Sequence, residues 1–125
     1  MDENELSKII VDCCYKIHTK LGAGLLESVY EEVLCYELSK HNLHVERQKA
    51  LPFIYESVRM EIGFITDIIV EDKVIIEIKS VNELAQVHHK QLLTYLKLTN
   101  LKLGILVNFN VNLIKDGIKR IVNKL

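Results

Sequence analysis

The stretch from residue 58 to residue 79 constrains the fold more than any other part of the chain, because its pattern fixes two strands and their register. Between residues 44 and 80 the apolar pattern has a period of two and β-branched residues dominate, as strands require. Glu71-Asp72-Lys73 interrupts this stretch as a short loop. If the loop closes a hairpin, Asp67 lies opposite Glu77. Lys79 shares the face of Glu77 because side chains alternate along a strand.

Asp67 and Glu77 would repel each other in this arrangement, and a half-buried setting would increase the repulsion. A bound cation would remove the conflict. A hard divalent ion such as Mg²⁺ accepts carboxylates, a backbone carbonyl and waters, and it leaves room for a phosphate oxygen. Lys79 could then orient or help to deprotonate a bound water and offset the charge that develops on the phosphate. The pair therefore predicts a metal site.

The alternative is an ordinary solvated surface, on which both acids face water and Lys79 neutralises one of them. The residues around the acids argue against it, because they leave little polar surface on either side of the sheet. These flanking residues are Phe64, Ile68, Ile69, Ile75, Ile76 and Ile78. A carboxylate in a sheet that is covered on both faces is costly unless it has a partner.

Apolar residues at helical spacing predict one helix on each side of Gly22-Ala23-Gly24 and a third helix after the hairpin. On the second helix, the pattern puts Leu26, Val29 and Tyr30 on the apolar side. The predicted helices cover residues 3–21, 25–41 and 82–99, and the predicted strands cover residues 44–54, 58–70, 74–79 and 101–107. The third helix makes a crossover, so the last strand runs parallel to its neighbour. Residues 117–122 could be helix or edge strand. This order predicts an α/β fold with a central mixed β-sheet flanked by helices.

The length of 125 residues suffices for a packed core without disulfides, and we expect a single domain over residues 1–125. The net charge of −1 provides no global positive field, so any contact with nucleic acid must use a local patch. The three cysteines match neither a disulfide framework nor a zinc spacing. Neither a signal peptide nor a membrane span is predicted, which favours a cytoplasmic location.

Three motifs, in order along the chain, give it a resemblance to a known family. Asp67, nine further residues and then Glu77-Ile78-Lys79 resemble the D…ExK core of the PD-(D/E)XK nuclease superfamily. Gly24-Leu25-Leu26-Glu27-Ser28-Val29-Tyr30 resembles the motif of its GxxExxY branch, and Gln91-Leu92-Leu93-Thr94-Tyr95 resembles the QxxxY element of RecB-type nucleases. The resemblance implies a restriction-endonuclease-like fold and a Mg²⁺- or Mn²⁺-dependent nuclease that acts on DNA, or on RNA.

The resemblance also implies roles for individual residues. Asp67 and Glu77 would be metal ligands, and Lys79 would be the catalytic lysine. Glu27 would be an auxiliary metal ligand, acting directly or through water. A structural role for Glu27 is the alternative, because an acid in the first turn of a helix suits the helix dipole.

Gln91 and Tyr95 are four residues apart on one helix face, and the resemblance implies that they line the catalytic cleft and position the substrate. Gln91 falls within an apolar stripe, and a buried amide without partners costs about 1–3 kcal/mol, so it should face the acid pair. A purely structural Gln–Tyr pair is the alternative. Tyr30 would bind substrate by hydrogen-bonding a phosphate or a carboxylate, with a core position as its alternative. His88 and His89 point about 100° apart and are expected at the rim.

The sequence departs from the pattern at two positions, of which Ile65, together with the near-neutral charge, keeps a second hypothesis open. Thr66 replaces the proline of the superfamily's name, and Ile65 stands where an arginine is common in the GxxExxY pattern. The second hypothesis is a catalytically inactive nucleic-acid-binding or protein-interaction module with the same fold. The basic segment from Lys115 to Lys124 is the best candidate for phosphate contacts, with an ordinary solvated surface as the favoured interpretation. A homo-oligomer or a larger complex also stays open.

Overall fold

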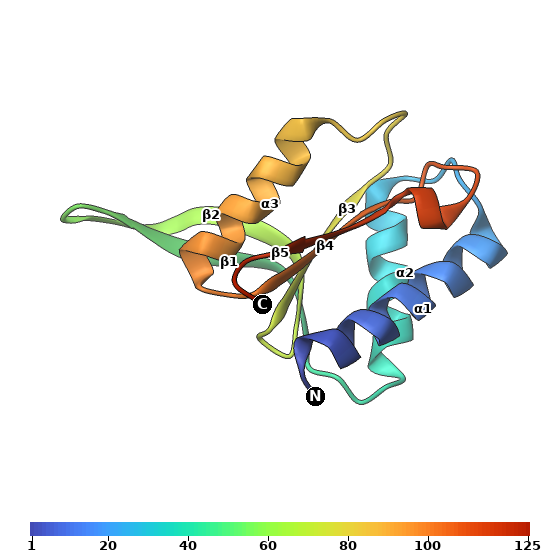
Figure 1. Cartoon of the computed structure of the whole chain (residues 1–125), viewed down its shortest axis with the longest axis horizontal. Helices are drawn as coiled ribbons and strands as arrows, with labels where there is room; N and C mark the ends of the chain where they lie inside the picture. The colour runs from blue at the N-terminus through green and yellow to red at the C-terminus, as the bar shows by residue number, and fades with distance from the viewer.

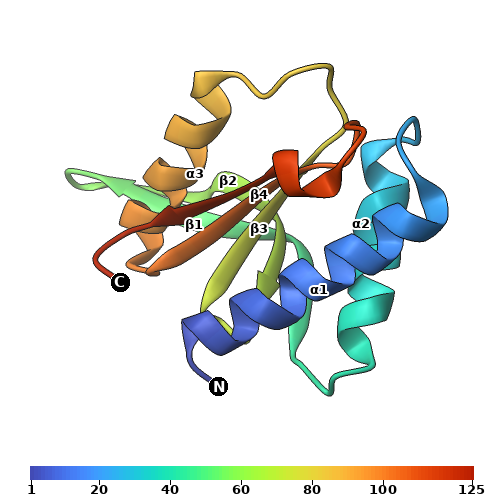
Figure 2. The ribbon, with the colours of Figure 1, turned by 45° about the vertical axis from the view of Figure 1, so that its right-hand side comes forward.

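The computed structural model describes all residues from 1 to 125 and shows a five-stranded mixed sheet with helices on both faces (Figures 1 and 2). The helices are α1 (Glu3–Leu21), α2 (Glu27–Ser39), α3 (Gln86–Thr99) and a short 3₁₀ helix, η1 (Ile114–Asp116). The strands are β1 (Val45–Tyr55), β2 (Val58–Val70), β3 (Val74–Lys79), β4 (Leu103–Asn108) and β5 (Ile118–Val122), in this order across the sheet. Only β3 and β4 run parallel. The predicted α/β architecture is confirmed.

The β2–β3 hairpin has the predicted register. Val70 pairs with Val74 across the loop of residues 71–73, and the pairing continues to Ile68 and Ile76. At that point the β2–β3 ladder ends, although β2 still pairs with β1 and β3 still pairs with β4 as far as Lys79. The two strands therefore separate where Asp67 and Glu77 would form the next pair.

Both faces of the sheet are covered. Helices α1 and α2 lie on one face and α3 lies on the other (Figure 2). The larger core, under α1 and α2, includes Ile76 and Ile78, and a smaller core, under α3, includes Ile75 and Leu92. Helix α3 lies close to β4 because Gly104 has no side chain; a Cβ there would lie 2.8 Å from Cγ of Leu92. The polar residues in this sheet are therefore held between two apolar layers.

Helix α2 is shorter than predicted, since it begins at Glu27 and ends at Ser39. Leu26 is 73% exposed and Val29 is 37% exposed, so their predicted place on the buried side is wrong. The buried side of α2 instead includes Tyr30 and Leu34.

Helix α3 begins at Gln86, four residues later than predicted. The amide of Asn108, at the end of β4, holds the preceding segment. Val81 N–H donates to Asn108 Oδ1 at 3.1 Å, and Asn108 Nδ2 donates to the carbonyl of Val81 at 2.9 Å. These bonds keep the backbone of Val81 in a non-helical conformation, so α3 cannot begin directly after β3. Of the two alternatives for the C-terminal segment, the edge strand is the one that forms, as β5 antiparallel to β4.

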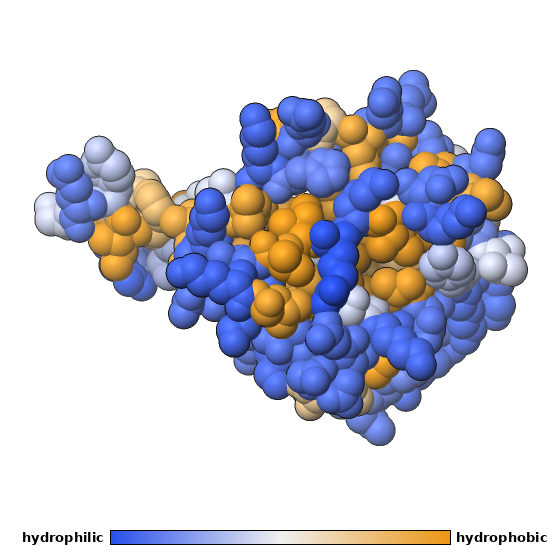
Figure 3. All heavy atoms as spheres, viewed as in Figure 1, coloured by the Kyte–Doolittle hydropathy of each residue, from blue (hydrophilic) through white to orange (hydrophobic).

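The far ends of β1 and β2 extend beyond the rest of the sheet as a two-stranded arm (Figure 1). No helix covers this arm, and apolar side chains on it are exposed, among them Ile54, Tyr55, Val58 and Ile62. The space-filling view shows apolar and hydrophilic residues together on the arm (Figure 3). None of the helices combines the length and the apolar character that crossing a bilayer requires.

Candidate functional site

Asp67 and Glu77 lie together where β2 and β3 separate. Each carboxylate accepts a hydrogen bond from a backbone N–H of the other strand, in place of backbone pairing between the strands. The backbone N–H of Ile78 donates to Asp67 Oδ2 at 2.8 Å. The backbone N–H of Asp67 lies 3.4 Å from Glu77 Oε2 and donates to it. Because the carboxylates fill the gap between the strands, the hairpin brings the two acids together as the register predicts.

Glu77 is the most perturbed acid of the site. It is only 7% exposed, and burial raises the pKa of its carboxyl to about 9, with hydrogen bonding to Asp67 and repulsion by Asp67 adding to the effect. The charge of Lys79 lowers the pKa but does not compensate. In the metal-free protein Glu77 therefore keeps its proton at neutral pH. A divalent cation beside it would displace that proton, because a metal binds the carboxylate form.

The raised pKa makes the stability of the metal-free protein depend on pH. The folded state binds a proton at Glu77 that the unfolded state releases above a pH of about 4.5, so stability is fully present below that pH and falls as the pH rises toward 9. Glu77→Gln removes the ionisable group. We expect this variant to gain on the order of 5 kcal/mol of unfolding free energy over wild type at pH 8.5, and less than about 1 kcal/mol at pH 5.

Urea unfolding with a chelator present, at both pH values, measures this difference. Glu32→Gln is the matched control, because Glu32 is an exposed acid of α2. A wild-type protein and a Glu77→Gln variant that lose stability in parallel between pH 5 and pH 8.5 would contradict the assignment of the proton to Glu77.

Lys79 ends β3 two residues after Glu77, and its side chain is half-buried. It forms no ion pair with any carboxylate. The alternative in which Lys79 simply neutralises one of the acids by direct contact is therefore absent from the structure. The charge of the ammonium group lowers the pKa of Glu77.

Glu27 is the first residue of α2, and its side chain reaches from this helix to the end of β3. Its Oε2 accepts a hydrogen bond from the backbone N–H of Ser80 at 3.3 Å, immediately after Lys79. A cavity of about 240 Å³ lies between α2 and the strands, and its lining residues are Glu27, Ser28, Glu31, Gln48, Asp67 and Ile78. The structure thus places Glu27 and Asp67 on the same hollow.

Two residues of this cavity, Glu31 and Gln48, escaped the sequence analysis. Glu31 is only 6% exposed, and its carboxylate accepts hydrogen bonds from Gln48 Nε2 at 2.6 Å and Arg47 Nη2 at 3.0 Å. Gln48 Nε2 also donates to Asp67 Oδ1 at 3.2 Å. One signal could have identified Glu31, because it lies four residues after Glu27 and so on the same helix face. Nothing in the local pattern marks Gln48.

Tyr30 lies in the core and not in the cavity. It is fully buried, and its ring stacks on that of Phe109 with the centroids 4.4 Å apart. Its hydroxyl donates to the carbonyl of Gly22 at 2.6 Å and accepts from the N–H of Leu25 at 3.2 Å. Since the hydroxyl anchors the loop before α2, we correct the substrate-binding prediction for Tyr30 to its alternative, a core position.

Gln91 is exposed, so the prediction that its amide is buried within an apolar stripe is wrong. Helix α3 buries Leu92 and Leu96 instead, whereas Val87 is 64% exposed. Tyr95, one turn after Gln91, is half-buried and stacks on Phe64 with the ring centroids 4.4 Å apart. Burial raises the pKa of Tyr95, and the charges of Glu77 and Asp67 add to the effect.

The two histidines of α3 are half-buried at its start, as expected for rim residues. Nδ1 of His88 accepts the backbone N–H of Ala85 at 3.1 Å, which caps the helix. Lys115 lies on η1, and Lys119 and Arg120 lie on β5, which β4 separates from the strand of Glu77. Their contact with phosphate stays a prediction.

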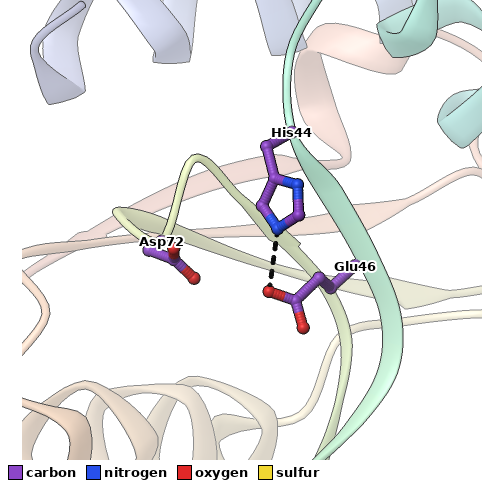
Figure 4. A group of neighbouring side chains, drawn as sticks. All are labelled: His44, Glu46 and Asp72. Carbon is purple, nitrogen blue, oxygen red and sulfur yellow. Dashed lines mark hydrogen bonds and ion pairs between the residues drawn. The ribbon is translucent and has the colours of Figure 1, made fainter.

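One group of three potential metal ligands has its ligand atoms within 4.8 Å of one another, and it is not the acid pair with Glu27 but His44, Glu46 and Asp72, at the other end of the hairpin (Figure 4). The ammonium of Lys49 already contacts this group, at 3.0 Å from Glu46 and 3.9 Å from Asp72. His44 Nε2 lies 3.0 Å from Glu46 and completes a network of polar contacts at the surface. Because a lysine supplies the positive charge, this group needs no metal, and we favour the Asp67 and Glu77 pair.

A larger hollow of about 480 Å³ lies between α1 and residues 111–115 and is lined by Tyr15, His18 and Lys115 among others. No carboxylate lines it, and His18 already bonds the carbonyl of Val111 at 2.8 Å. It offers no set of oxygen ligands for a hard cation, so size alone does not make it the functional site.

Comparison with known proteins gave one match. A family model described as the PD-(D/E)XK nuclease superfamily matches residues 4–121. The five-stranded mixed sheet with helices on both faces is consistent with the restriction-endonuclease-like fold of that superfamily. No curated protein and no solved structure matches the chain significantly.

Proposed function

Because the chain belongs to the PD-(D/E)XK nuclease superfamily, we propose that it is a nuclease that hydrolyses phosphodiester bonds in DNA with Mg²⁺ or Mn²⁺ bound beside Asp67 and Glu77. The observation that carries this proposal is the pair of buried Glu77 and half-buried Asp67 in the gap between β2 and β3, with the Lys79 ammonium free of ion pairs. RNA is the alternative substrate. We also propose that residues 1–125 act as one domain.

The residues of the cavity fit a hard divalent cation. Asp67 and Glu27 line the cavity with carboxylate oxygens, and Glu77 adjoins Asp67 outside the lining, with its Oε2 3.4 Å from the Asp67 N–H. No cysteine or histidine lines that cavity, which favours Mg²⁺ or Mn²⁺ over zinc. When bound, the ion would neutralise the acid pair and stabilise negative charge on a phosphate oxygen.

The chain's own residues would supply the rest of the chemistry. The Lys79 ammonium would orient the attacking water and offset the charge that develops on the phosphate during in-line attack. Tyr95 would position the substrate backbone from α3, and the exposed Gln91 would contact it one turn earlier. Because these groups come from β2, β3 and α3, the substrate would lie across the gap between the strands and the helix.

We further assign the chain to the GxxExxY branch, with a RecB-like QxxxY element. The position of Glu27 on the cavity of Asp67 supports the first assignment. The effect of the two acids on the pKa of Tyr95 supports the second. In this chain the tyrosine of the GxxExxY motif, Tyr30, has the structural task of anchoring the loop before α2.

End-labelled single- and double-stranded DNA and RNA, incubated with the purified protein, test the proposal. We expect cleavage of DNA with Mg²⁺ or Mn²⁺ and none when a chelator is present. Protein that cleaves none of these substrates would overturn the nuclease assignment. A calorimetric titration with Mn²⁺ separates the remaining cases, because an inactive module that binds the metal would still give a binding isotherm, whereas a module without a metal site would not.

A further inference from the structure

Two consecutive residues of β1, Arg47 and Gln48, reach the same carboxylate. Arg47 Nη2 donates to Glu31 Oε2 at 3.0 Å, and Gln48 Nε2 donates to Glu31 Oε1 at 2.6 Å. Consecutive side chains of a regular strand point to opposite faces, so a regular β1 would not allow this. The backbone of Gln48 is not regular, since its φ is +46°. That conformation is unfavourable for a residue with a Cβ, and here it turns the Gln48 side chain toward α2.

The same amide nitrogen of Gln48 also contacts the acid of the candidate site. Gln48 Nε2 lies 3.2 Å from Asp67 Oδ1, and a side-chain amide has two N–H groups, one for each of its two carboxylate partners. The other oxygen of Asp67 accepts from the backbone N–H of Ile78 at 2.8 Å. Both oxygens of Asp67 therefore have a fixed donor, one on β3 and one on β1.

Glu31 gives this contact its rigidity. It is buried, it lies on α2 one turn after Glu27, and both of its oxygens are occupied by β1 side chains. Glu31 of α2 bonds Gln48, and Gln48 in turn bonds Asp67. Donors of this kind, which contact a metal-binding group and not the metal, commonly set the orientation of that group.

We propose that Gln48, anchored by Glu31, is a positioning residue that holds the Asp67 carboxylate in the orientation required to bind the divalent ion. The proposal rests on the proposed function, because it assigns Asp67 to the metal. Backbone strain at Gln48 supports it, since unfavourable conformations concentrate at functional sites. A purely structural role, in which Gln48 only ties β1 to α2, predicts that Arg47 is equally important, because Arg47 bonds the same carboxylate without a hydrogen bond to Asp67.

The experiment compares Gln48→Met with Arg47→Met. Methionine has a similar length to glutamine but no N–H group, and both variants break one bond to Glu31. We expect Gln48→Met to weaken Mn²⁺ binding, measured by calorimetry on the full chain, by about 10-fold, and to lower kcat for DNA by about 10- to 100-fold with KM little changed. Arg47→Met should stay within about 3-fold of wild type in Mn²⁺ affinity.

Gln48→Gly is the second variant, because glycine accepts the positive φ while lacking the amide, so its loss of affinity cannot come from backbone strain. Mn²⁺ affinity that is unchanged in both Gln48 variants, or reduced equally by Arg47→Met, would overturn the positioning role. The outcome for the proposed function is separate. Wild-type protein that binds Mn²⁺ without cleaving nucleic acid overturns the nuclease proposal alone, and wild-type protein that binds no Mn²⁺ overturns both.

Discussion

Asp67→Asn is expected to lower metal-dependent cleavage by about 10³-fold or more while the protein stays folded. Asparagine keeps the shape of the side chain and can still accept the N–H of Ile78, but it removes the negative charge. The loss of that charge also removes a repulsion that raises the pKa of Glu77. Because Glu77 is protonated at neutral pH and the asparagine oxygen can still accept its hydrogen bond, the metal-free variant should stay close to wild type in stability, although it cannot hold the divalent ion in the same way.

Single-turnover cleavage, Mn²⁺ calorimetry and urea unfolding of the Asp67→Asn variant check the three parts of this prediction. Asp72→Asn is the matched control. Asp72 is exposed, and its φ of +52° is one that asparagine accepts readily. It also belongs to the group with His44 and Glu46, so the same control tests that group. Full activity in Asp67→Asn, or a comparable loss in Asp72→Asn, would move the metal site away from the pair that we favour.

The hairpin that carries the acids could be predicted from sequence because local rules agree there. A period of two, a short loop and apolar residues on both faces leave one register in which the β-branched residues are buried. Val58–Val70 and Val74–Lys79 were accordingly predicted to the residue. The opposition of Asp67 and Glu77 follows from that register, because a shift of one residue would turn one of them to the other face.

The helix boundaries were harder to predict because long-range contacts set them. The segment after β3 stays extended since Asn108, from the end of a strand formed later in the chain, bonds both backbone groups of Val81. Helix α3 has apolar residues on two sides, with Leu92 and Leu96 buried and Val87 and Leu98 exposed. The side with Leu92 faces the sheet because Gly104 allows a close approach there. Gln91 consequently lies outside the buried stripe in which the pattern placed it.

The contact between Gln48 and Asp67 could not be predicted from any local pattern. It depends on a positive φ in the middle of a strand, which propensities disfavour, and on a helix residue seventeen positions earlier. Tyr30 illustrates the converse. Its place in a motif suggested a contact with substrate, whereas its burial against Phe109 gives it a structural task. Motifs thus identified the elements that carry the candidate site, and only the tertiary structure separated Gln48, which contacts Asp67, from Tyr30, which belongs to the core.

Lys79→Met is expected to separate metal binding from catalysis, because it should lower cleavage by about 10²- to 10³-fold and leave Mn²⁺ binding intact or tighter. Methionine keeps much of the length of the lysine stem but removes the ammonium. That charge currently favours the ionised form of Glu77, so its loss raises the pKa of Glu77 further, and it also removes the repulsion between the ammonium and a divalent ion. At a pH near 9, where the first effect matters least, the variant should bind Mn²⁺ at least as tightly as wild type.

Calorimetry and single-turnover cleavage at pH 9 measure the two quantities for Lys79→Met in parallel. Lys8→Met, at an exposed position of α1, is the control for the loss of one positive charge from the whole molecule. If Lys79→Met cleaves as wild type does, the lysine has no part in the chemistry, and the absence of an ion pair at Lys79 needs another explanation. If it loses metal and activity together, Lys79 supports the fold of the site and not the reaction, because an ammonium that only stabilises developing charge on the phosphate cannot be needed to hold a cation.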